Sequence, residues 1–331
     1  MTIFRVTAIG VGAFYLLMAL PAAAQRYSIV DLGAFSTATG INGNGTITGS
    51  LHSNAFAYSA GTMINLGTLG GKSSEGESIN TAGAVAGYST LADGTYRAFL
   101  YSHGRMVSLG TLGSNYSAAY ALNDAGQVVG SSMTAKNLSH AFLYSAGTMI
   151  DLGTLGGNQP GWSTTAASIN AMGRVVGYSY LPSGDFHGFL YANHRMHDLG
   201  TLGGSWSQAF AINAAEQITG QAYLPGNASA HAFLYSGGSM TDLGALNHYS
   251  SGLAINGSGV VVGNADVRNN TGVMVYHAVI YQNGAPLDLN GLIPSRTGWV
   301  LSTATAVNDA GEIVGYGTLR GVQHGFLLTP R

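Results

Sequence analysis

Short segments rich in β-branched and aromatic residues alternate with turns that contain Gly and Asn along most of the chain. Runs such as Gln127-Val128-Val129 and Ala141-Phe142-Leu143-Tyr144 have the length and composition of β-strands. Four kinds of segment recur in a fixed order, and each carries its own short signature. This recurrence indicates a chain built from internal repeats.

Each signature occurs seven times. The first, of the Ala-Ile-Asn type, ends at Asn42, Asn80, Asn123, Asn170, Asn213, Asn256 and Asn308. The second, of the Val-Val-Gly type, ends at Gly49, Gly87, Gly130, Gly177, Gly220, Gly263 and Gly315. The third, of the His-Ala-Phe type, ends at Phe56, Phe99, Phe142, Phe189, Phe233, Val279 and Phe326. The fourth, of the Asp-Leu-Gly type, centres on Leu32, Leu66, Leu109, Leu152, Leu199, Leu243 and Leu289.

Two of the spacings between signatures are constant and two vary. Each signature Asn lies 7 residues before the following Val-Val-Gly glycine. The signature Phe or Val lies 10 residues before the following leucine in all six copies that have one. Each constant spacing contains a tight turn, such as Asn123-Asp124-Ala125-Gly126, in which Asn accepts local backbone hydrogen bonds. Glycine takes the third position after the Asn in six of the seven copies, with Glu216 as the exception. The repeating unit is therefore two hairpins, or four strands.

Seven copies of a four-stranded antiparallel unit predict an all-β fold, a seven-bladed β-propeller over residues 25–331. The last copy ends at Phe326-Leu327-Leu328 without a fourth strand, whereas an unmatched fourth strand, Tyr27–Gly33, opens the mature chain. We expect this N-terminal strand to complete the last blade and to remove its exposed edge. An open β-solenoid is the alternative, but it would require capping units at both ends.

The constant and variable connections should lie on opposite faces of the propeller. In an up-and-down blade, the turns after the first and third strands share one end, and the other two connections share the opposite end. Loops of variable length gathered on a rigid scaffold are typical of a binding surface. We call the two ends the fixed face and the variable face, and we expect function on the variable face.

Aromatic residues recur in the variable connections, including all three tryptophans of the chain. Flat rings beside Ser, Asn and Gln suit stacking on sugars, while the polar groups orient the ligand. The alternative is that each ring packs between adjacent blades, as the regular spacing favours. The longer connections of Trp162 and Trp299 make these two the stronger candidates. The predicted ligand-binding residues are Tyr116, Trp162, Trp206, Tyr249 and Trp299.

Glu75 and Glu77 form the best candidate pair for catalysis, in the one connection that lacks the aromatic residue. Two carboxylates at a suitable separation can hydrolyse a glycosidic bond. The alternative is that both are solvated loop charges. No nucleophile elbow, phosphate-binding loop, zinc signature or calcium loop accompanies them.

The aligned histidines are expected to be structural, because a catalytic group is needed once rather than in every repeat. They are His140, His187, His231, His277 and His324. Recurrent aspartates in the fourth strand, such as Asp151, make a structural His–Asp pair conceivable. We predict no metal site and no cofactor.

Composition narrows the class further. Met1–Arg5 is cationic, Val6–Leu20 is apolar and Pro21–Ala24 is small, which predicts a signal peptide over residues 1–24 that is cleaved after Ala24. The chain has no Cys, only 8% charged residues and a net charge of −2. No cluster of Lys and Arg is available to neutralise phosphates, so nucleic acid is not an expected partner. We expect a secreted or periplasmic monomer, with no membrane span after cleavage.

The motif His140-Ala141-Phe142-Leu143-Tyr144-Ser145, followed by Asp151-Leu152-Gly153-Thr154-Leu155-Gly156-Gly157, resembles the bacterial HAF family of extracellular repeats. The resemblance covers essentially the whole mature chain and departs locally, for example where Asn290 replaces the signature Gly. It implies export and repetition but no reaction. We therefore expect a non-catalytic binding or scaffold protein, with a glycan or other cell-surface polymer as ligand. The alternative is a carbohydrate-active hydrolase or lyase that uses the two glutamates.

Overall fold

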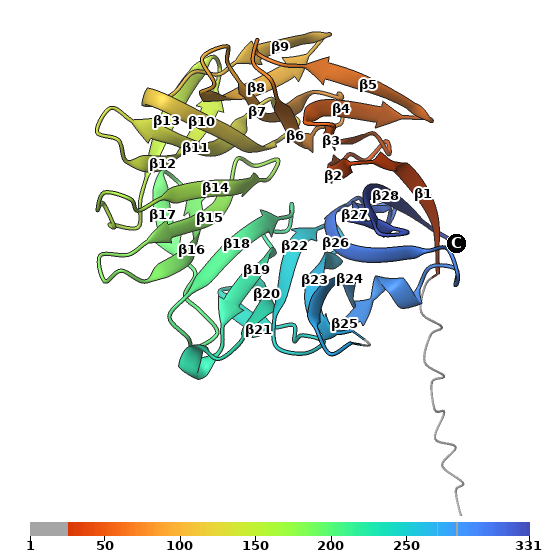
Figure 1. Cartoon of the computed structure of the whole chain (residues 1–331). Coiled ribbons are helices and arrows are strands. Elements are labelled where there is room, and N and C mark those ends of the chain that lie inside the picture. The colour runs from red at the N-terminus through yellow and green to blue at the C-terminus, as the bar shows by residue number, and fades with distance from the viewer. Residues whose placement is uncertain (1–25, 270, 283) are drawn as a thin grey trace, which may run out of the picture.

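The computed structural model describes residues 26–269, 271–282 and 284–331, so the predicted signal peptide lies outside the described residues. Seven four-stranded antiparallel sheets surround a common axis (Figure 1). This confirms the predicted seven-bladed β-propeller. Two short 3-10 helices, η1 (Pro225–Asn227) and η2 (Leu289–Gly291), interrupt the strands.

The first three blades follow one another in chain order. Blade 1 consists of β2 (Ser36–Ile41), β3 (Ile47–Leu51), β4 (Asn54–Ser59) and β5 (Thr62–Gly67). Blade 2 consists of β6 (Ser74–Ile79), β7 (Val85–Thr90), β8 (Tyr96–Ser102) and β9 (Arg105–Ser108). Blade 3 consists of β10 (Gly113–Leu122), β11 (Val128–Thr134), β12 (Ser139–Ser145) and β13 (Thr148–Gly153).

The next three blades repeat this order. Blade 4 consists of β14 (Thr164–Ile169), β15 (Val175–Tyr180), β16 (Phe186–Ala192) and β17 (Arg195–Asp198). Blade 5 consists of β18 (Ser207–Ile212), β19 (Ile218–Tyr223), β20 (Ala230–Ser236) and β21 (Ser239–Asp242). Blade 6 consists of β22 (Ser250–Ile255), β23 (Val261–Arg268), β24 (Met274–Gln282) and β25 (Ala285–Asp288).

Blade 7 joins the two ends of the described chain. It combines β26 (Trp299–Val307), β27 (Ile313–Leu319) and β28 (Val322–Pro330) with β1 (Tyr27–Ala34), in the order β1-β28-β27-β26. The red β1 lies beside the dark blue β28 in Figure 1, and the two strands run antiparallel with Tyr27 opposite Pro330. The predicted closure by the N-terminal strand is therefore confirmed.

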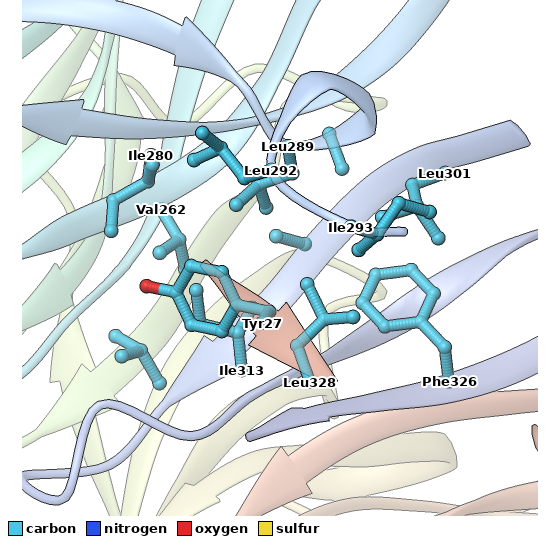
Figure 2. Close-up of a cluster of buried hydrophobic side chains, with 13 residues drawn as sticks. Tyr27, Val262, Ile280, Leu289, Leu292, Ile293, Leu301, Ile313, Phe326 and Leu328 are labelled. Carbon is cyan, nitrogen blue, oxygen red and sulfur yellow. The ribbon is translucent and has the colours of Figure 1, made fainter. Parts of the chain in front are cut away.

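The closing strand contributes to the core as well as to the sheet edge. Tyr27 is 1% exposed and lies in a buried cluster with Leu289, Ile313 and Leu328 (Figure 2). Further along the same strand, Asp31 accepts a hydrogen bond of 2.7 Å from His324 Nδ1. The sheet, the core and a polar pair thus all join the N-terminal strand to the last blade.

A β-bulge interrupts every innermost strand at the same position, three residues before the signature Asn. The residue just before each bulge pairs with the Val-Val-Gly glycine, for example Ala166 with Gly177. A Cβ atom added to Gly177 would lie 1.9 Å from the Thr165 carbonyl oxygen, and the other six glycines are equally crowded. The seven signature glycines are therefore required by close backbone approach, without a positive φ.

The signature asparagines form a closed ring of hydrogen bonds around the axis. Each side-chain NH2 group donates to the main-chain oxygen of the Asn in the next blade, and the last bond, from Asn308 to Asn42 at 3.2 Å, closes the circle. Each Oδ1 accepts from the backbone N–H four residues later in its own turn. One side chain therefore fixes a turn and joins two blades, and we call this set the Asn ring.

Glu216 takes the glycine position of this turn in blade 5. Glycines at this position have positive φ, such as 74° at Gly173, and Glu216 adopts the same left-handed conformation with φ of 58°. Its carboxylate accepts a hydrogen bond of 3.2 Å from Arg174 Nε in the preceding blade. An added inter-blade ion pair accompanies the strained backbone at this one position.

Replacing Asn170 with Asp is expected to lower the free energy of unfolding by about 1–3 kcal/mol. The carboxylate keeps the acceptor for Arg174 N but loses the donor and faces the Asn213 oxygen, 3.1 Å from the present nitrogen. Urea unfolding of the purified protein measures the difference. Asn269→Asp is the matched control, because Asn269 Oδ1 accepts from Val273 N in an exposed turn outside the ring. Equal loss in both variants would contradict the role of the ring.

Candidate functional site on the variable face and in the channel

The blade order separates the connections as the sequence predicts. The Asn turns and the turns between the third and fourth strands lie at one end of each blade, and the connections of variable length lie at the other. Two places gather residues that break the repeat. One is a run of aromatic rings on blades 4 and 5, and the other is the lining of the central channel.

The aromatic run links two blades, and we call it the aromatic rim: Trp162, Tyr180, Phe186, Trp206 and Tyr223. Trp162 stacks on Tyr180 at 4.9 Å with an interplanar angle of 19°, and Tyr180 contacts Phe186 edge-on at 4.6 Å. Phe186 stacks on Trp206 at 6.3 Å, and Trp206 lies 5.4 Å from Tyr223. Trp162 and Trp206 are half-buried, so each packs on a neighbouring ring and still exposes part of its indole.

The other predicted aromatic contacts have different surroundings. Trp299 begins β26 and packs edge-on against Phe326 at 6.2 Å and His324 at 5.8 Å. Tyr249 is 37% exposed and forms a parallel bridge to Ala230 of the preceding blade. Tyr116 lies within β10, 6.4 Å from Tyr96. These rings do not join the aromatic rim, and their roles as ligand contacts stay predictions.

Glu75 and Glu77 do not lie in a connection, so the sequence-based location was wrong. Both belong to β6, the innermost strand of blade 2. Within this strand Ser74, Gly76 and Ile79 are buried, whereas Glu75 and Glu77 are half-buried. Glu75 lies opposite Tyr88 on β7 and accepts a hydrogen bond of 2.7 Å from its hydroxyl.

The seven bulged residues face the channel and differ from blade to blade, unlike their neighbours. We call them the bulge ring: Thr39, Glu77, Tyr120, Ala167, Phe210, Leu253 and Thr305. With Thr165 and Tyr178 they line a cavity of about 360 Å³. Each is half-buried, as expected for side chains around a narrow opening. The sequence carried a signal for this ring, since the position three before each Asn varies while its neighbours repeat.

Electrostatics in the channel are set by one uncompensated carboxyl group. Burial, and secondarily the nearby charge of Glu75, raises the pKa of Glu77 to about 8. Glu77 makes no hydrogen bond with any described group, and it is the one ionisable acid or base among the residues lining the cavity, apart from tyrosines. Burial also raises the pKa values of Tyr88, Tyr120 and Tyr178, so these phenols stay neutral and keep their protons. The channel thus combines neutral aromatic rings with a glutamate.

The aligned histidines pair with the aspartates of the fourth strand in five blades. In each pair the ring Nδ1 lies 2.7–3.0 Å from a carboxylate oxygen. In four of the pairs the aspartate also accepts from the signature Gly N–H, as Asp151 does from Gly153 at 2.8 Å. The pairs join the third and fourth strands of a blade, which supports the structural interpretation.

Within residues 26–269, 271–282 and 284–331, no three His, Cys, Asp or Glu side chains gather in a way that would hold a metal ion. No helix there has the length and apolar composition needed to cross a membrane.

No family model matches the sequence, and no curated protein is significantly similar to it. The HAF resemblance therefore stays a prediction. Among solved structures, the chain resembles the β-propeller domain of the Trilobed protease from Pyrococcus furiosus, with 9% identity, a TM-score of 0.55 and coverage of 92% of this chain and 98% of that one. At this identity the likeness concerns the fold alone.

Two further solved structures match over part of their own length. TolB from Acinetobacter baumannii is 14% identical, with a TM-score of 0.46 and coverage of 75% of this chain and 63% of that one. A puromycin-hydrolyzing peptidase from Mycobacterium tuberculosis is 12% identical, with a TM-score of 0.49 and coverage of 89% and 49%. The chain therefore spans roughly half to two thirds of these two proteins. The fold is that of a β-propeller, and any function has to be argued from the residues of this chain.

Proposed function

We propose that this protein is an exported binding propeller that holds a glycan or another cell-surface polymer on its variable face. The observation that carries the proposal is the aromatic rim, where two tryptophans on neighbouring blades expose part of their rings. Rigid aromatic faces give large contact area at little entropic cost, and sugars stack on them readily. Because the rim crosses a blade boundary, it suits an extended ligand better than a compact one.

Polar groups surround the rim and can orient such a ligand. Asn158 and Gln159 precede Trp162 in the same loop and are exposed, and Ser205 precedes Trp206. Asn227 lies beside Ser205, with its amide donating 3.0 Å to the Ser205 hydroxyl. Neutral amides and hydroxyls match the hydrogen-bonding groups of an uncharged polysaccharide.

Export belongs to the proposal and rests on the sequence of residues 1–24. A short cationic start, an apolar run and an Ala-Ala-Ala end are the features a signal peptidase requires. Membership of the HAF family would fit the same location. A protein recovered from the periplasm or medium with Gln25 as its first residue would support this part, and retention of Met1 in the cytoplasm would contradict it.

Replacing both Trp162 and Trp206 with Ala is expected to weaken polymer binding at least tenfold, since each ring supplies stacking worth about 1 kcal/mol or more. The wild-type protein is first screened against immobilised polysaccharides, and the variants are then compared on the polymer it binds. Trp299→Ala in the same assay tests the third tryptophan predicted to contact ligand.

Met172→Ala is the control for loss of an exposed apolar side chain, because Met172 is 58% exposed in a turn of the fixed face. Thermal unfolding shows whether each variant remains folded. Unchanged affinity in the folded double variant would refute the rim as the binding surface.

The second candidate function is a carbohydrate-active hydrolase or lyase, and the pair Glu75 and Glu77 favours it. A glutamate with a pKa near 8 is protonated at neutral pH, as a general acid must be, and Glu75 lies two residues away on the same strand. Reducing ends are measured in the same wells as binding. Turnover that disappears in the Glu75→Gln, Glu77→Gln double variant would favour this candidate, and absence of turnover would leave the binding function alone.

A further inference from the structure

The central channel has a chemistry distinct from that of the aromatic rim. Its cavity of about 360 Å³ is within the size range of small-molecule sites. Tyr120, Tyr178 and Phe210 contribute aromatic rings to its lining, and Tyr178 and Phe210 meet edge-on at 6.5 Å. Glu77 contributes a carboxyl group for which no described residue provides a partner. The lining therefore lacks the positive group that its carboxyl would pair with.

We propose that this channel binds a small organic cation, with its ammonium group beside Glu77 and against the rings of Tyr120, Tyr178 and Phe210. Aromatic faces attract cations through the negative face of the ring, more strongly when water is excluded. An unpaired carboxylate in a confined site gains more from a bound cation than an exposed one does. No Lys or Arg among the described residues lines the cavity to compete with that ligand.

The rest of the repeat shows that the carboxyl group is not needed for the fold. Thr39 and Thr305 occupy the same bulged position in blades 1 and 7. Their hydroxyls donate to the backbone of the next blade, Thr39 to the Gly76 oxygen and Thr305 to the Ala38 oxygen. A threonine at this position therefore joins two blades. Glu77 makes no such bond, and its carboxyl group lies in the channel without a partner among the described residues.

The titratable groups around Glu77 are Glu75 on β6, Tyr88 on β7 and Tyr120 on β10, while Thr39 on β2 is neutral. Tyr88 donates to Glu75 and leaves Glu77 free. The pKa of Glu77 is about 8, so at a pH below this value the carboxyl group of the free protein is mostly protonated. A cation that pairs with the carboxylate must then displace that proton to bind. A ligand whose own charge is fixed should therefore bind more weakly as the pH falls.

The test uses choline, whose charge is independent of pH over this range, and 3,3-dimethylbutan-1-ol, its uncharged analogue of nearly the same shape. Affinities are measured by isothermal titration calorimetry on residues 25–331. We expect choline to bind at least tenfold more tightly than the alcohol. From the pKa of Glu77, binding at pH 6.5 should be up to about thirtyfold weaker than at pH 9.

Two variants separate the carboxyl group from the fold. Glu77→Gln keeps the shape, and Glu77→Thr restores the residue found in blades 1 and 7; both should bind choline at least tenfold more weakly and lose the pH dependence. Glu216→Gln, on the fixed face, is the control and should bind as the wild type does. Equal affinity for the alcohol, undiminished binding in the Glu77 variants, or no choline binding at pH 9 would each overturn the proposal. Since the rim is untouched by these changes, the result is independent of the polymer-binding function.

Discussion

Replacing Gly177 with Ala is expected to destabilise the protein by about 3 kcal/mol or more, or to prevent folding altogether. The added Cβ would lie 1.9 Å from the Thr165 oxygen and 2.9 Å from the Ala166 Cα, both of them backbone atoms. Neither can rotate away, so β14 and β15 would have to separate where the bulge brings them together. The free energy of unfolding, from urea denaturation, measures the effect.

Gly43→Ala is the matched control for this substitution. Gly43 lies in the Asn turn of blade 1, has no positive φ and has no atom within 4 Å of the position its Cβ would take. Alanine there should change stability by less than about 1 kcal/mol, with stabilisation as the expected direction. If Gly177→Ala proved as mild as Gly43→Ala, the close approach at the bulge would be refuted.

Replacing Tyr27 with Ala is expected to cost about 3–5 kcal/mol of folding free energy, as for other large buried aromatic residues. Tyr27 is 1% exposed and lies among Leu289, Ile313 and Leu328, where β1 packs against the last blade (Figure 2). Truncation leaves a cavity there and weakens the strand that closes the ring. Val30→Ala, on the same strand but 40% exposed, should change stability by less than about 1 kcal/mol.

The Tyr27 substitution also tests closure as distinct from local packing. Because β1 is the fourth strand of blade 7, its loosening should expose the edge of β28 and increase amide hydrogen exchange there. Increased exchange in Val322–Pro330 with unchanged exchange in the blade 4 strands would fit the account. A uniform change in amide exchange throughout the molecule, or no change in β28, would contradict a closing role for β1.

The fold could be predicted from the sequence because the repeat encodes it at several levels. The constant spacings reveal two hairpins, the count gives seven blades, and the unmatched strand at Tyr27–Gly33 indicates closure. The sequence predicts the Asn turns for a local reason, because the Asn side-chain oxygen can accept backbone hydrogen bonds within its own turn. The hydrogen bond that each Asn side chain donates to the next blade depends on the distance between neighbouring turns, as between Asn170 and Asn213. Residue spacing along the chain does not contain that distance.

The site could be predicted only in part. The variable face follows from the parity of the strands, and Trp162 and Trp206 do meet in one aromatic run. Glu75 and Glu77 fall in a predicted connection because the stretch between Leu66 and Asn80 is treated as one connection, whereas its last part, Ser74–Ile79, is strand β6. The bulge shifts the alternation of side chains within β6, so simple counting could not show that Glu77 faces the axis.

We propose that polymer binding belongs to the variable face of the propeller and that the repeated residues of the fixed face are architecture. The most direct measurement is hydrogen–deuterium exchange of the protein with and without the polysaccharide it retains in the screen. We expect protection in the loops at Asn158–Ser163 and Gly203–Trp206, and none in the Asn turns at Asn170–Arg174 and Asn213–Gln217. Protection of those Asn turns, with the loops of the aromatic rim unchanged, would contradict the account.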